Sequence, residues 1–258
     1  AATPPSQRPT AAPVPTTSPS TTQTAGSVFR DCAECPEMVV IPAGRFEMGS
    51  NNGERNEKPV HSVDVRSFAL GKYEVTQGQW MALMGGNPSR FANCGEECPV
   101  ELVSWDEAKF YLKKLNAKVS GSEEGPYRLP SESEWEYACR GGGRHKYCGS
   151  DDVGSVAWYE WNSGGKTRRA GMKAPNGYGL HDLSGSVWEW AEDCWHESYS
   201  GAPTNGSAWT SGGDCSRRVE RGGSWSNNPA WVRSVTRSRD GASRHINLLG
   251  FRVARTLP

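Results

Sequence analysis

The eight cysteines of the chain fall into four pairs that are close in sequence. An even number of paired cysteines is typical of disulfides in an oxidising compartment. A thiolate zinc site using Cys32-x-x-Cys35 and a second pair is a weaker alternative, because the second spacing differs and the intervening loops are long. A thioredoxin-type redox role is weaker again, since no βαβ pattern surrounds this motif. We therefore predict four disulfides: Cys32–Cys35, Cys94–Cys98, Cys139–Cys148 and Cys194–Cys215.

A second group of residues with chemical potential is the segment DLSGSVWE, residues 182–189. The carboxylates of Asp182 and Glu189, with the carbonyl oxygens of Gly185 and Val187, supply the oxygen ligands that a hard cation prefers in an irregular loop. The alternative is that both carboxylates only cap turns. The spacing favours a calcium site.

The histidines offer little for catalysis. No two of them form an H-x3-H or H-x-D/E cluster on an expected helix. His181 and His196 could combine with Asp182 or Glu197 in a facial metal triad, but single histidines in loops are more often structural. Metal analysis of the purified protein is the test of that alternative.

Hydrolytic chemistry is also weakly indicated. The only serine of interest, Ser224, lies in Gly-Ser-Trp and lacks the second glycine and the strand–turn–helix setting of a nucleophile elbow. Glu132, Glu134 and Glu136 lie on a short helix, where we expect them to be capping and solvated groups.

Composition excludes several classes of protein. The 258 residues carry 29 basic and 29 acidic side chains, so the formal net charge is zero. This argues against binding to nucleic acid or to an anionic membrane through the net electrostatic field of the protein. No apolar run approaches the roughly 20 residues of a membrane helix. Eleven Trp and 30 Gly predict a core of aromatic planes and tight turns in place of long amphipathic helices.

Residues 1–27 form a segment rich in Pro, Thr and Ser that cannot bury a core, and residues 28–258 read as one continuous domain. The alanines at the start are typical of what remains after signal cleavage, so we expect an exported protein, periplasmic or extracellular. We also expect a protein partner, which the N-terminal segment could engage because it has too few apolar residues to dock on its own domain.

Local signals predict the elements that must position these residues. Capping boxes at Thr76, Ser104 and Ser131 each start a helix. Short strands are expected over residues 38–42, 46–49 and 63–68. Periodicity is weak from residue 139 to about residue 220, so that part is expected to be irregular and held by cross-links or ions.

Eight ordered segments together resemble the formylglycine-generating enzyme family, also called sulfatase-modifying factor domains. They are PEMVVIPAG (36–44), EVT (74–76), PVELVSW (99–105), YRLPSESEWEYA (127–138), NGYGL (176–180), GSVWEW (185–190), RGGSW (221–225) and GFR (250–252). The resemblance covers about nine-tenths of the chain. It implies an α+β fold with a C-type-lectin-like core, little regular secondary structure and disulfide staples.

The resemblance also bears on the sites. The calcium loop of this family usually has Asn at the position of Asp182. An Asp at this position still supplies an oxygen ligand. Arginines at positions 221, 233, 237 and 252 match places where the family tends to keep Arg, which implies a buried hydrogen-bonding scaffold.

The oxidases of the family hold Cu(I) with two cysteines that follow the Arg-Gly-Gly-Ser segment. In this chain the corresponding positions are near Asn227 and Val232, and no Cys follows Cys215. Neither side chain can replace a thiolate as a ligand of a soft ion. We therefore expect no copper and no formylglycine generation.

In lectin-like relatives the corresponding region forms a ligand face. We expect such a face here from exposed aromatic, amide and basic side chains, with packing of the tryptophans as the alternative. Its members would be Trp225, Asn227, Asn228, Trp231, Arg239, Arg244 and His245. The predicted function is an exported, non-catalytic binding or accessory module for a protein or glycan partner. The alternatives are a metal-dependent oxidase of the pyoverdine-maturation type and a variable protein for ligand capture.

Overall fold

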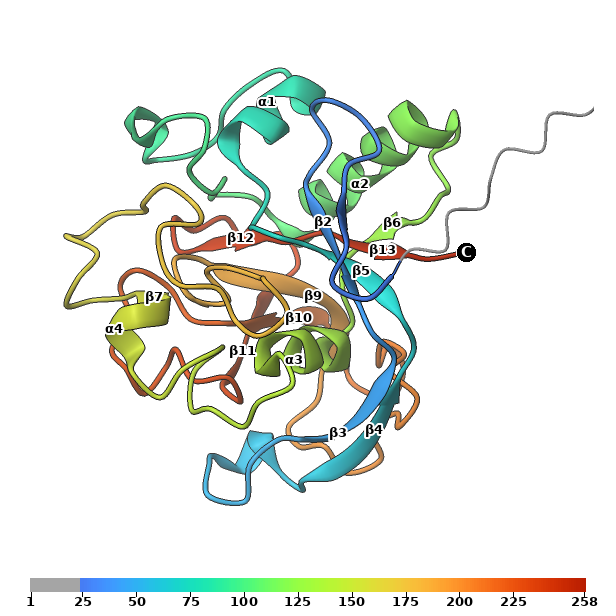
Figure 1. Ribbon diagram of the computed structural model, residues 1–258, viewed down its shortest axis with the longest axis vertical. Coiled ribbons are helices and arrows are strands. Elements are labelled where there is room, and N and C mark those ends of the chain that lie inside the picture. Colours follow the sequence, from blue (N-terminus) through green and yellow to red (C-terminus); the bar gives the residue numbers. More distant parts are fainter. Residues whose placement is uncertain (1–23) are drawn as a thin grey trace, which may run out of the picture.

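A five-stranded and a four-stranded sheet form the framework of the protein, whose computed structural model describes residues 24–258 (Figure 1). The larger sheet has the order β1-β2-β5-β13-β6, and the smaller has β11-β10-β9-β12, in which only β12 and β9 are parallel. Two further strand pairs are the β3–β4 hairpin and β7–β8. The strands are β1 (Val28–Phe29), β2 (Met38–Ile41), β3 (Gly44–Met48), β4 (His61–Val65), β5 (Phe68–Gly71), β6 (Tyr127–Arg128), β7 (Ala157–Trp158), β8 (Ser184–Gly185), β9 (Trp188–Trp195), β10 (Asp214–Arg221), β11 (Arg237–Gly241), β12 (Leu249–Phe251) and β13 (Ala254–Thr256).

The three helices begin where the sequence predicts. In each, the N-cap hydroxyl accepts from the third helical amide, and that residue's side chain accepts from the N-cap amide in return. The helices are α1 (Gln77–Met84), α2 (Trp105–Ser120) and α3 (Glu132–Arg140), with a single turn α4 (Val153–Val156). Helices α1 and α2 lie together at the top of Figure 1, whereas α3 packs on β9, β10 and the β3–β4 hairpin.

The expected strands are present, with two differences in how they pair. Residues 63–68 do not form one strand: β4 ends at Val65, and β5 starts at Phe68 in another sheet. Likewise β2 pairs with β1 and β5, while β3 pairs only with β4, so the chain leaves one sheet between Ile41 and Gly44.

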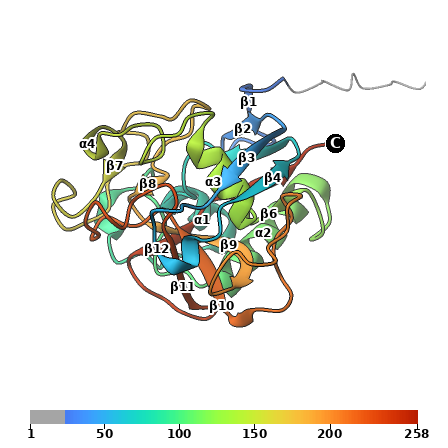
Figure 2. The same ribbon diagram turned by 90° about the horizontal axis from the view of Figure 1, so that it is seen from below.

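The expectation of an irregular segment up to residue 220 is wrong in part, because β9 and β10 are the longest strands described. Seven of the eight β9 residues are buried, and a strand covered on both faces shows no alternation of apolar and polar residues. Elsewhere loops dominate this segment (Figure 2). The α+β class with modest regular structure is confirmed.

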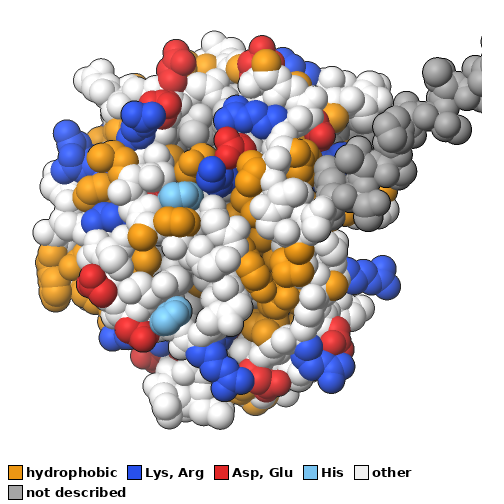
Figure 3. Space-filling model, viewed as in Figure 1, with side chains coloured by type: hydrophobic (Ala, Val, Ile, Leu, Met, Phe, Trp, Pro, Cys, Tyr) orange, Lys and Arg blue, Asp and Glu red, His pale blue; other side chains and the backbone are white. Residues whose placement is uncertain are grey.

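All four predicted disulfides are present, and none of the described cysteines is free. None of the helices within residues 24–258 is both long and apolar enough to cross a bilayer. Basic and acidic side chains are interspersed over the face shown in Figure 3. The proposed role of the N-terminal segment falls mostly on residues 1–23, which lie outside the described part.

The smaller sheet contains a buried acid that makes stability depend on pH. Burial raises the pKa of Glu220 on β10 from 4.5 to about 7, which outweighs the opposing effect of its hydrogen bond with Ser238. Between these values the folded state binds one proton more than the unfolded state, so the free energy of unfolding falls as pH rises through this window.

We therefore expect Glu220→Gln to make this slope shallower and to stabilise the protein above pH 7 by on the order of 1–3 kcal/mol, while the buried Asp193 on β9, whose pKa is also raised to about 7, keeps part of the slope. Urea unfolding of the two proteins at pH 5 and pH 8 measures the effect. Glu123→Gln, at an exposed position, is the control. Parallel pH profiles for Glu220→Gln and the unmodified protein would contradict the prediction.

Candidate functional site

The site we consider first is a pocket of about 480 Å³ beside Trp231, here called the Trp231 pocket. Three separate segments form it: the turn at residues 54–57, Glu197 two residues after β9, and the β10–β11 loop with the first residue of β11. Trp231 is 48% exposed and stands on the rim. The lining residues are Glu54, Arg55, Asn56, Glu57, Glu197, Ala230, Trp231, Arg233, Thr236 and Arg237.

The loop from residue 222 to residue 236 presents Trp231 because its neighbours are fixed. Gly223 has φ +76°, and a Cβ there would lie 2.8 Å from the Trp231 carbonyl oxygen, so only glycine fits this turn. Val232 is fully buried against Tyr147 and Tyr159. With the next residue anchored in the core, the indole of Trp231 is held at the surface.

The floor of the pocket is Arg237, which is held from several sides. Its Nη2 donates to Glu132 Oε2 at 2.8 Å, and its Nη1 donates to the Asn56 carbonyl at 2.6 Å. Its guanidinium also lies 4.2 Å from the ring centroid of Tyr199. Only 3% of Arg237 is exposed, so the pocket meets a charge with a fixed orientation.

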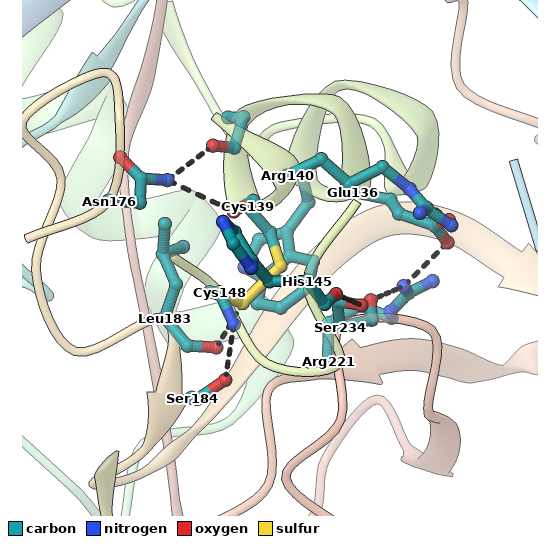
Figure 4. The surroundings of a disulfide bond; sticks show 12 residues. Glu136, Cys139, Arg140, His145, Cys148, Asn176, Leu183, Ser184, Arg221 and Ser234 are labelled. Carbon is teal, nitrogen blue, oxygen red and sulfur yellow. Dashed lines mark hydrogen bonds and ion pairs between the residues drawn. A yellow bond between two sulfur atoms is a disulfide. The ribbon is translucent and has the colours of Figure 1, made fainter. Parts of the chain in front are cut away.

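Arg237 belongs to a set of connected ion pairs that we call the Arg–Glu network. Its members are Arg237, Glu132, Arg221, Glu136 and Arg140. Arg221 donates to Glu132 Oε1 at 2.8 Å, and Arg140 donates to Glu136 Oε1 at 2.6 Å. Arg221 also donates to Glu136 Oε2 at 2.8 Å (Figure 4). Burial opposes ionisation of both glutamates, but the adjacent guanidiniums outweigh it and lower the pKa of Glu132 and of Glu136.

This network corrects one expectation. Glu132 and Glu136 are not solvated, since they are 3% and 0% exposed, whereas Glu134 does serve the capping box. Helix α3 is buried from Glu132 to Cys139, so its polar side chains also face protein. The spacing i,i+4 of the two glutamates, with matching arginines in the C-terminal third, was the signal that could have identified them. Arg221, Arg237 and Arg252 are buried, in agreement with a scaffold role.

A peripheral ion pair closes one wall of the pocket. Arg233 is half-buried and donates to Glu57 Oε1 at 2.6 Å. Glu197, which also lines the pocket, accepts from Trp195 Nε1 at 2.9 Å, and this hydrogen bond lowers the pKa of Glu197. The pocket therefore offers carboxylate and guanidinium groups beside one exposed indole.

The seven residues predicted to form a ligand face differ in what they contact. Of these, only Trp231 lines the pocket, while Arg239 lies near it, 3.8 Å from Glu197. Trp225 instead packs edge-on against Phe91 and donates to the Asn247 carbonyl.

The other members of that face make local contacts. Asn227 accepts from the Ser224 amide and hydroxyl, and Asn228 accepts from the Ala230 amide. Arg244 lies 3.6 Å from Asp240, and His245 lies 2.8 Å from Glu107 at the start of α2. The pocket residues at positions 54–57 and 197 were not predicted, because no local motif links them to the β10–β11 loop, and Ala230 and Thr236 within that loop carry no chemical signal of their own.

The predicted calcium loop has one free oxygen and one occupied carboxylate. Asp182 is 2% exposed; its Oδ2 accepts from the Gly171 amide at 2.6 Å, and its Oδ1 has no partner among the described residues. Glu189, by contrast, accepts from Arg252 at 2.7 Å and from Trp135 Nε1 at 2.7 Å. Asp182 thus fits a cation ligand, whereas Glu189 is committed to Arg252.

A third carboxylate adds negative charge to this loop. Glu74 is buried and accepts from the Ser186 hydroxyl and the Val187 amide. Burial and the neighbouring carboxylates raise the pKa of Glu74, and burial raises that of Asp182. Within residues 24–258 no three His, Cys, Asp or Glu side chains cluster as metal ligands, so backbone carbonyls would have to complete a site.

The histidines proposed for a metal triad do not converge. His181 Nδ1 lies 2.8 Å from the Lys173 carbonyl. His196 has both ring nitrogens near carbonyl oxygens, those of Cys194 and Ser211, and stacks on Trp209. Both are structural contacts within their loops.

Comparison with known proteins identifies relatives that share this fold. The family model "Sulfatase-modifying factor enzyme 1-like domain" matches residues 24–257. The "Chaperone protein LppX" of Paenibacillus barcinonensis is 32% identical over 240 residues, which cover 73% of this chain and 78% of that protein.

Two solved structures are similar over nearly their whole length. PvdO from Pseudomonas aeruginosa is 33% identical with a TM-score of 0.80, covering 91% of this chain and 99% of that chain. The Treponema denticola variable protein 1 is 29% identical with a TM-score of 0.78, covering 90% and 99%. With the family model matched almost from end to end of the described residues, the chain belongs to the sulfatase-modifying factor enzyme 1-like (formylglycine-generating enzyme) domain family.

Proposed function

We propose that this chain is an exported, non-catalytic binding or accessory module, and that it engages a glycan or protein partner through the Trp231 pocket. The observation that carries the proposal is the half-exposed indole of Trp231 above a pocket with a rigid, charged floor. Aromatic side chains with one wet edge are enriched at recognition surfaces.

The arrangement of Arg237 supports recognition, because a ligand would not have to order it. Its four nitrogen–oxygen contacts to Glu132, Asn56 and His196 are already made, so little side-chain entropy is lost on binding. A volume of about 480 Å³ suits one or two sugar rings or one anchoring side chain.

Export is supported by the four disulfides, which are typical of oxidising compartments. The similarity to a protein named a chaperone supports an accessory role. The position of Asn227 and Val232 where the family's oxidases carry copper-binding cysteines supports a role without that copper chemistry.

A second candidate function is a metal-dependent oxidase of the pyoverdine-maturation type. The similarity to PvdO over 99% of its length favours it. Elemental analysis of protein purified without chelator separates the two: stoichiometric redox metal supports the oxidase, and its absence with a retained partner supports the module.

We further propose a structural calcium ion at the loop of residues 182–189. Asp182 Oδ1 would be the side-chain ligand, with the carbonyl oxygens of Gly185 and Val187, and Glu189 would hold the loop through Arg252. The buried, unpartnered oxygen of Asp182 supports this assignment. A bound dication would offset the negative charge of Glu74 and Asp182, which Arg252 alone does not balance.

For the Trp231 pocket, we expect Trp231→Ala to weaken binding by at least about tenfold, because an exposed indole that a ligand covers on binding contributes about 1.4 kcal/mol or more. Glycan arrays and partner capture from an envelope extract, followed by titration of the hits, provide the measurement. Trp161→Ala is the matched control, since Trp161 is 72% exposed but lines no part of this pocket. Equal losses in both variants, or none in Trp231→Ala, would refute the site.

For the calcium loop, we expect chelation to lower the melting temperature by about 5–10 °C, since calcium at 100 times its Kd contributes about 2.7 kcal/mol. Calorimetry with chelator and with added calcium gives the shift. Asp182→Asn keeps an oxygen ligand and should retain the shift, whereas Asp182→Ala should lose it. If neither chelator nor added calcium changes the melting temperature of the unmodified protein, the proposed calcium site is refuted.

A further inference from the structure

A second pocket, of about 410 Å³, is lined by Arg140 of the Arg–Glu network. One wall is strand β3, and the others are the end of helix α3 and the glycine-rich turn that follows it. We call it the Tyr–Arg pocket after its functional side chains, Arg45, Tyr137, Arg140, Arg144 and Tyr178. It shares no lining residue with the Trp231 pocket.

The lining of this pocket is cationic, with three arginines against the single carboxylate of Glu47. Arg45 pairs with Asp64, which lies outside the lining, at 2.7 Å. Arg140 shares the Glu136 carboxylate with Arg221, so one carboxylate serves two guanidiniums. Arg144 is exposed and makes no ion pair with any other residue in the described range. Positive charge is therefore left over at the pocket.

A buried hydroxyl in the same pocket lacks an acceptor. Tyr137 is only 7% exposed, and its hydroxyl oxygen accepts from the Tyr178 hydroxyl at 3.3 Å. No described residue accepts the Tyr137 proton in turn. Burial raises the pKa of Tyr137, so this group stays a hydrogen-bond donor. Gly44 lets the hydroxyl approach, because a Cβ there would lie only 2.3 Å away from it.

The turn that carries Arg144 is fixed at both ends. The Cys139–Cys148 disulfide closes it, Asn176 donates to the carbonyls of Ala138 and Cys139, and the Cys148 amide donates to Ser184 (Figure 4). A site with restrained walls loses less entropy on binding.

We propose that the Tyr–Arg pocket binds the carboxylate of an acidic monosaccharide of the uronic-acid class. Guanidinium forks pair with carboxylates in the plane, and Arg144 is free to do so beside the Tyr137 hydroxyl. The ring of Phe46, which is partly exposed in the pocket lining, offers an apolar face for the sugar ring, which an inorganic anion would not use.

Titration of the full chain with D-glucuronate tests the proposal, with D-glucose and inorganic phosphate as comparison ligands. Glucuronate should bind at least about tenfold more tightly than either, since glucose lacks the carboxylate and phosphate lacks the ring. Arg144→Ala should weaken glucuronate about tenfold, and Tyr137→Phe should weaken it several-fold with an unchanged melting temperature. Arg66→Ala, at an exposed arginine outside the pocket, is the control.

Three results overturn the proposal: no binding of glucuronate at millimolar concentration, phosphate binding as tightly as glucuronate, or equal affinities of Arg144→Ala and the unmodified protein. Trp231→Ala should leave glucuronate binding unchanged, so the two pockets succeed or fail separately.

Discussion

The structure depends on the Arg–Glu network, a set of buried ion pairs in which the loss of any one charged side chain leaves another without its partner. Glu132 and Glu136 on α3 face Arg221 on β10 and Arg237 on β11, and all four are at most 3% exposed. Taking such ions out of water is costly, and their mutual pairing compensates for it only while every partner is present. Loss of one member leaves an unpaired buried charge, which typically costs about 3–5 kcal/mol. The network therefore specifies how α3 is placed on the smaller sheet.

The same network connects the two pockets. Arg237 forms the floor of one and Arg140 lines the other, and Glu132, Arg221 and Glu136 lie between them. Each carboxylate is shared, so the position of one guanidinium restricts the next. The charged group in each pocket is thus held in place by residues that line neither pocket. Loops supply Trp231 and Arg144, which are exposed members of the two pockets.

Local chemistry made part of this fold predictable. Capping boxes gave three helix starts, and close cysteine pairs gave four disulfides, because each signal acts over a few residues. The pairing of β3 with β4 and the burial of β9 depend on contacts between distant segments, which leave no periodic trace. The Trp231 pocket was missed for the same reason: Glu57 and Arg233 meet across 176 positions of sequence. Only the exposed Trp231 carried a signal of its own.

The pairing pattern of the four disulfides bears on the order in which they can form. Each cysteine is bonded to its nearest cysteine along the chain, with separations of 3, 4, 9 and 21 residues. Eight cysteines permit 105 pairings, and this one is the strictly sequential pairing. A chain that enters an oxidising compartment from its N-terminus presents each pair before the next appears. For such a chain, oxidation of each neighbouring pair in turn would give this pairing without a shuffling step.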